Sequence, residues 1–171
     1  MQVVKKMLIS FFVLWFAALL FMPKKELYYA LEEFLEKQSI SINEKHIEES
    51  IFTLKLHDVS VYVKGIKIMS VDKIRFFTLF FYTTVKADNI LVDESFTQFI
   101  PERLDKAKAI HTLLNPIDIR LSGVGSFGLA EGMVNLKTNH IRIDLSEIKK
   151  INNIRNLLKK DEKGLYYETS F

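Results

Sequence analysis

The sequence contains no cysteine and is poor in proline and glycine. Without thiols the chain forms no disulfide, no thiolate metal site and no thiol nucleophile. Three prolines and six glycines are too few for a collagen-like or low-complexity chain. Hydrophobic residues make up 49% of the chain and charged residues 26%, which argues against a disordered protein. These figures favour one folded, non-redox domain that carries an additional N-terminal segment.

The chain also lacks a strong excess of either charge. Four of its lysines, Lys5, Lys6, Lys24 and Lys25, flank the first apolar run. Without these four, the 24 basic residues fall to 20 against 21 acidic residues, which leaves a formal net charge of −1. The remainder has no general cationic field that attracts nucleic acid. We therefore expect no nucleic-acid partner.

An uncharged run, MLISFFVLWFAALLFM, extends from Met7 to Met22. As a helix it is about 24 Å long, which is short for a hydrocarbon core of roughly 30 Å, although flanking lysines can snorkel to the headgroups. We therefore predict that residues 1–22 form a cytoplasmic tail and a transmembrane signal anchor, and that residues 23–171 form a periplasmic β-rich domain. A cleaved signal peptide is one alternative, but no small-x-small cleavage site follows the run. A buried soluble helix is the other.

Three later segments have patterns typical of helices. Residues 24–37 place Leu27, Leu31 and Phe34 on one side of a helix and three glutamates on another. In the polar stretch that follows residue 92, Pro101 favours the start of a helix that ends near Leu114. Ser146 is a plausible N-cap for a third helix over residues 147–160.

The rest of the chain alternates with a period of two, which predicts strands over residues 39–92 and 117–145 and a last edge strand over 165–171. The alternation changes phase at His57 and Asp58, which predicts a β-bulge there. No strand–helix–strand rhythm is present, so a dinucleotide-binding fold is not expected. The predicted fold class is therefore α+β, with a mainly antiparallel sheet and flanking helices.

Residues 74–82, IRFFTLFFY, are apolar on both faces of a predicted strand. An antiparallel strand with one face in water should instead alternate. The strand is therefore either central and covered on both sides, or one of its faces meets lipid or a partner. The candidate lipid- or partner-facing residues are Phe76, Phe77, Leu79, Phe80 and Phe81.

No motif for catalysis, cofactor binding or metal binding stands out. The four histidines have no metal-ligand spacing, and Ser126 lies in no G-x-S-x-G frame. The segment GVGSFG, from Gly123 to Gly128, lacks the GK[ST] of a phosphate loop and predicts a turn with positive φ. We therefore expect a protein that is not an enzyme, with no catalytic residue, no cofactor and no metal.

The order of several segments carries a resemblance to a known family. These segments are P-x-x-x-L-x-x-x-L-x-x-x-L from Pro23 to Leu35, NPIDIRLSGVGSFGLAEGMVNL from Asn115 to Leu136, HIRIDL from His140 to Leu145, and KGLYYE from Lys163 to Glu168. The chain resembles the GspN proteins of type II secretion systems, which are similar in turn to the AsmA-like envelope proteins.

The resemblance implies a curved, taco-like sheet in a non-enzymatic protein of the bacterial inner membrane, with a single span and its domain in the periplasm. Such a protein is a structural component of a secretion or envelope assembly. The alternative is a lipid-binding or lipid-transfer module of the AsmA-like type. The implied partners are the lipid bilayer, other envelope or secretion proteins, and phospholipid.

Overall fold

The computed structural model describes residues 2–20, 23–79, 81–98, 100–147, 154–162 and 164–171. It contains two α-helices, α1 (Gln2–Leu20) and α2 (Lys24–Glu36), and two short 3₁₀ turns, η1 (Glu94–Phe96) and η2 (Arg155–Leu157). The described residues otherwise form eleven strands: β1 (Ile40–Asn43), β2 (His46–Glu49), β3 (Thr53–Val63), β4 (Ile66–Leu79), β5 (Tyr82–Val92), β6 (Arg103–Thr112), β7 (Asn115–Gly125), β8 (Gly128–Asn135), β9 (His140–Ser146), β10 (Lys159–Asp161) and β11 (Gly164–Ser170).

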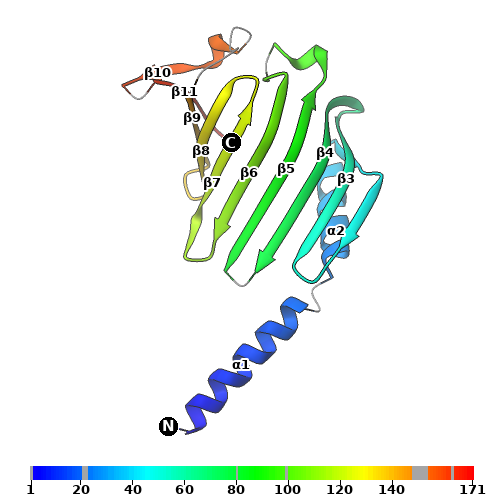
Figure 1. Ribbon diagram of the computed structural model, residues 1–171, viewed down its shortest axis with the longest axis vertical. Coiled ribbons are helices and arrows are strands. Elements are labelled where there is room, and N and C mark those ends of the chain that lie inside the picture. Colours follow the sequence, from blue (N-terminus) through cyan, green and yellow to red (C-terminus); the bar gives the residue numbers. More distant parts are fainter. Residues whose placement is uncertain (1, 21–22, 80, 99, 148–153, 163) are drawn as a thin grey trace.

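All eleven strands belong to one antiparallel sheet, as the period-two pattern predicts (Figure 1). The strand order is β1-β3-β4-β5-β6-β7-β8-β9-β11-β10, and β2 also pairs with β3. From β3 to β9 every strand lies beside its neighbour in sequence, so the sheet is a meander of hairpins. The last predicted strand, β11, is not an edge strand, because β10 pairs with its outer side.

The predicted transmembrane helix is wrong. Among the described residues, no helix is both long enough and apolar enough to cross a membrane. The helix α1 includes Lys5 and Lys6, and its uncharged part from Met7 to Leu20 extends only about 21 Å at 1.5 Å per residue. Phe21 and Met22, the end of the predicted span, lie outside the described residues.

The predicted helix over residues 24–37 is confirmed as α2, which packs on one face of the sheet (Figure 1). Its buried residue is Tyr28, which joins Leu54 and Leu56 of β3 and Val71 of β4 in the main hydrophobic core. The Tyr28 hydroxyl donates a hydrogen bond to Glu44 Oε2 over 2.6 Å. Burial and this acidic partner hold the pKa of Tyr28 well above its ordinary value, so the hydroxyl stays a donor at neutral pH. We call this face of the sheet the inner face and the opposite one the outer face.

The phase change at His57 and Asp58 is real, but it is not a β-bulge. His57 pairs with Lys73 and Val59 pairs with Val71, so the register is the same on both sides of Asp58. A bulge would insert an extra residue in one strand and shift that register. Instead, the inward-facing residues of β3 and β4 change phase at the same level, and Asp58 has a positive φ of 51°. The register shift between these strands occurs later, between Val61 and Tyr62.

The other two predicted helices are wrong where the structure describes them. The segment from Pro101 to Leu114 contains strand β6, in which lysine and alanine alternate at positions 106–109. Of residues 147–160, the range 148–153 lies outside the described residues, and the remainder contains only η2 and the start of β10. Glu147 has a φ of +50°, a conformation that cannot begin a right-handed helix.

Candidate functional site

Two rows of side chains cross the inner face of the sheet from β3 to β11. Residues that pair directly across antiparallel strands lie on the same face, so the strand register defines each row. One row consists of Leu54, Phe76, Val85, Ala109, Leu121, Gly132, Ile143 and Tyr167. The next consists of Leu56, Ile74, Ala87, Ala107, Gly123, Ala130, Leu145 and Leu165. Neither row contains a charged side chain.

Side-chain size divides the inner face in two. On β3 and β4 the rows carry large residues, and α2 covers them. On strands β5–β8 six of the eight positions are alanine or glycine: Ala87, Ala107, Ala109, Gly123, Ala130 and Gly132. Small side chains leave the backbone of the sheet as the floor of an open groove. This apolar groove has a volume of about 550 Å³, within the range of roughly 300–1,000 Å³ that is typical of ligand sites.

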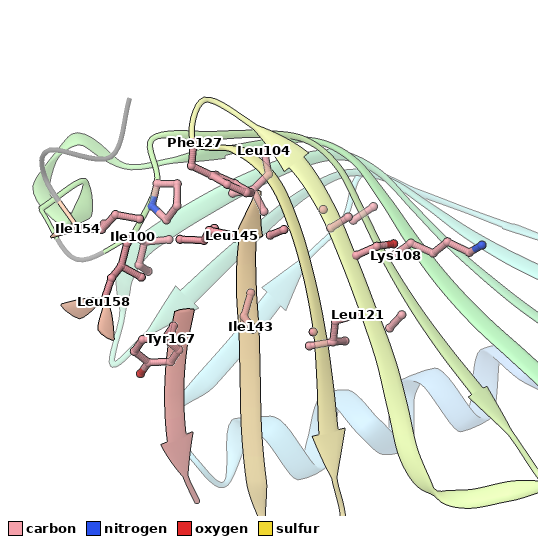
Figure 2. Close-up of a pocket in the computed structure, with 18 of the residues that line it drawn as sticks. Ile100, Leu104, Lys108, Leu121, Phe127, Ile143, Leu145, Ile154, Leu158 and Tyr167 are labelled. Carbon is pink, nitrogen blue, oxygen red and sulfur yellow. The ribbon is translucent and has the colours of Figure 1, made fainter. Parts of the chain in front are cut away.

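Larger apolar residues form the walls and one end of the groove (Figure 2). Phe127, Leu145 and Ile154 form a second buried cluster, with exposed fractions of 3%, 9% and 8%. Ile154 comes from the segment that precedes η2, far from Phe127 in sequence, so the chain returns to close this end. Ile143 and Tyr167 lie along the groove on β9 and β11.

The lining is chemically almost uniform. Lys108 is the only charged residue among the described residues that border the groove, and Figure 2 shows its ammonium group pointing away from the other lining residues. None of the described residues that border it carries a carboxylate or an imidazole. Among the described residues, no group of three or more His, Asp or Glu side chains is placed to hold a metal ion. The described lining therefore presents a hydrocarbon surface, and its residues place no acid–base pair in the groove.

The four described residues among the candidates predicted to face lipid or a partner lie outside this groove. Residues 74–82 do not form one strand, because β4 ends at Leu79 and β5 begins at Tyr82. Phe76 is on the inner face, in the covered half. Phe77 and Leu79 alternate with it and lie on the outer face, where Phe77 packs edge-on against Tyr82 with 6.4 Å between ring centroids. Phe80 lies outside the described residues.

Phe81 is at the tip of the β4–β5 hairpin and is 51% exposed. Its ring stacks on Trp15 of α1 with 6.3 Å between centroids. The four described residues are thus divided between the core, the outer face and a hairpin tip, and the structure does not bring them together in one site.

Phe76 does line a second, smaller cavity of about 180 Å³ between α2 and the sheet. Leu27 and Tyr28 of α2 and Leu54 of β3 line it as well. This cavity is an incompletely filled part of the core under α2, and it is much smaller than the groove on the uncovered half.

The sequence did contain a signal for the groove. The alternation Lys106-Ala107-Lys108-Ala109 places small apolar residues on one face of a strand, and Gly123, Ala130 and Gly132 do the same on the next two strands. A sequence search for large apolar residues does not find a site built from small ones.

Comparisons of the chain with family models, with curated proteins and with solved structures gave no match. The resemblance to GspN and AsmA-like proteins therefore stays a prediction.

Proposed function

We propose that the protein is a lipid-binding module whose apolar groove holds the acyl chain of a lipid. The observation that carries the proposal is the pair of unbroken apolar rows on the inner face, of which α2 covers only one half and small residues deepen the other. An exposed apolar surface of this kind is costly in water unless a ligand covers it. The purely structural function expected from the resemblance does not require such a groove.

The lining also limits the class of ligand. The described lining residues offer hydrocarbon contacts and no buried charge to hold an anionic or cationic headgroup. The polar end of a bound lipid would therefore lie at the open rim, in water, while its chain lies along the floor of alanine and glycine. Affinity should depend on chain length, because each buried methylene contributes about 0.8 kcal/mol, a factor of roughly four in the dissociation constant.

The seven alanines of the chain allow a direct test. Ala87, Ala107, Ala109 and Ala130 line the groove, whereas Ala17, Ala18 and Ala30 lie on the helices. Selective ¹³C labelling of alanine methyl groups would give one NMR signal for each. A fatty acid with a nitroxide on its chain should broaden the four groove signals at concentrations that leave the helix signals sharp.

A matched pair of variants completes the test. Gly123→Leu should fill the groove and abolish the selective broadening, because a Cβ at Gly123 would meet no atom closer than 3.6 Å and the fold can accept it. Glu131→Leu adds the same side chain to the outer face of the neighbouring strand and should leave the broadening unchanged. Equal broadening of all seven methyl groups, or broadening that survives in Gly123→Leu, would refute the proposal.

A further inference from the structure

The outer face of strands β3–β6 carries six basic residues, which we call the outer basic patch: Lys55, Lys73, Arg75, Lys86, Lys106 and Lys108. Four of them, Lys55, Arg75, Lys86 and Lys108, pair directly with one another across the four adjacent strands. At about 4.8 Å between strands, this line of positive charge extends over roughly 14 Å.

Stability of the fold does not account for this line. Like charges placed directly opposite each other in a sheet are destabilising. Only Lys55 has an ion-pair partner among the described residues, Glu48, at 2.9 Å between Nζ and Oε2. The only other carboxylate in these rows is Asp88, between Lys73 and Lys106.

The other half of the outer face is built differently. On β9, Arg142 forms ion pairs with both Asp144 and Asp161 and stacks on the Tyr166 ring, 4.2 Å from its centroid. Lys159 pairs with Glu168 at 3.1 Å. Arg142 and Lys159 are thus neutralised within the molecule, as is Arg103 at the start of β6, which pairs with Asp105. Lys73, Arg75, Lys86, Lys106 and Lys108 have no ion-pair partner among the described residues, so the outer basic patch is suited to an anionic partner.

A second feature lies at the hairpin tips beyond the outer basic patch, two rows of residues further along the strands. At the end of the sheet nearest α1 (Figure 1), the tips of the β4–β5 and β6–β7 hairpins are joined by a hydrogen bond from the Leu113 amide to the Phe81 carbonyl, over 2.8 Å. Phe81, Leu113 and Leu114 are exposed at these tips, with exposed fractions of 51%, 54% and 91%. We call these three residues the apolar tips.

We propose that the outer basic patch and the apolar tips together bind the surface of an anionic lipid bilayer. Cations are attracted to the negative surface potential of such a bilayer, and exposed aromatic and aliphatic groups enter the headgroup region. A nucleic acid would match the charge but would gain nothing from Leu113 and Leu114. The patch lies on the face opposite the groove, so this proposal and the proposed function stand or fall separately.

The test measures partition of the full chain into vesicles of phosphatidylcholine alone and of phosphatidylcholine with 30% phosphatidylglycerol. Comparing the two compositions cancels any contribution that depends only on apolar surface, including that of the uncharged part of α1. Lys5 and Lys6 of α1 are the same in every variant, so their contribution cancels when the variants are compared. The wild type should prefer the anionic vesicles, and the preference should fall as salt is added. Arg75→Gln/Lys86→Gln/Lys106→Gln should reduce the preference by at least about tenfold, since each basic residue near an anionic surface contributes roughly fivefold.

The control removes the same number of charges elsewhere. Lys37→Gln/Lys137→Gln/Lys160→Gln neutralises three exposed lysines on α2, the β8–β9 turn and β10, and should retain most of the preference. Circular dichroism should show that both variants are folded. An equal loss in the two variants would show a response to net charge alone and overturn the proposal. Equal partition of the wild type into both vesicle types would also overturn the proposal, whether or not the outer basic patch binds a DNA duplex.

Discussion

The two halves of the inner face have the same antiparallel strand pairing, the same alternation of side chains and the same apolar character, but they differ in what covers them. On β3 and β4, large side chains such as Leu56 meet Tyr28 of α2 and form a closed core. On β5–β8, alanine and glycine meet no helix, and a groove of about 550 Å³ remains. One continuous sheet thus has one half of its apolar face covered by a helix and the other half left as an open groove.

The largest expected effect concerns packing in the two halves. Leu56 is 1% exposed, so Leu56→Ala should lower the free energy of unfolding by about 2–5 kcal/mol. Leu121 lies on the same face but borders the open groove, so Leu121→Ala should cost only about 1 kcal/mol. Urea denaturation of both variants measures the difference. Equal losses would mean that the groove half is as tightly packed as the core, contrary to the comparison.

A second prediction separates two glycines within the groove half. A Cβ at Gly132 would lie 2.7 Å from the Arg142 carbonyl oxygen and 2.9 Å from Ile143 Cγ1, so Gly132→Ala should destabilise the fold by about 1–3 kcal/mol. A Cβ at Gly123 would meet no atom closer than 3.6 Å, so Gly123→Ala should stabilise it by about 0.5 kcal/mol through the unfolded chain. Thermal unfolding of the two variants should give melting temperatures on opposite sides of the wild type.

These two glycines show why the small residues, although they alternate as a groove floor requires, did not by themselves predict the groove from the sequence. Gly132 is required by close contact with the next strand, whereas Gly123 leaves space, and the sequence alone does not distinguish the two cases. The alternation of Leu54 and Leu56 did predict a half-buried strand. The alanines at 107 and 109 favoured a helix by intrinsic propensity, although the floor of a groove requires them in strand β6. Tertiary context therefore outweighed local preference where the candidate site lies.

The smallest expected effect is a pH dependence of the free energy of unfolding, which has opposite signs for a glutamate on α2 and a glutamate on β11. On α2, burial and the nearby carboxylates of Glu44 and Glu36 raise the pKa of Glu32. On β11, the hydrogen bond and charge of Lys159 and the nearby His140 lower the pKa of Glu168. A raised pKa means that ionised Glu32 costs stability at neutral pH, and this cost disappears as pH falls through the raised value. A lowered pKa means that Glu168 contributes stability above its ordinary value of 4.5, which is lost as pH falls through the lowered value.

Two amide substitutions test these signs. Glu32→Gln should raise the unfolding midpoint at pH 7, and Glu168→Gln should lower it. Both differences should shrink toward zero as pH falls below the folded-state and unfolded-state pKa of each carboxyl group, because the group is then protonated in both states. Urea titrations at a series of pH values follow the change, and shifts of the same sign in both variants would contradict the assignment.

An open sheet ends in two edge strands, each with backbone groups that a second molecule could pair with. Here both edges are short. At one edge, β1 and β2 share the side of β3 and have four residues each. At the other, β10 has three residues, of which two are lysines. Short and charged edges offer another chain little to extend, so a sheet of this size is protected against edge-to-edge growth into a fibre.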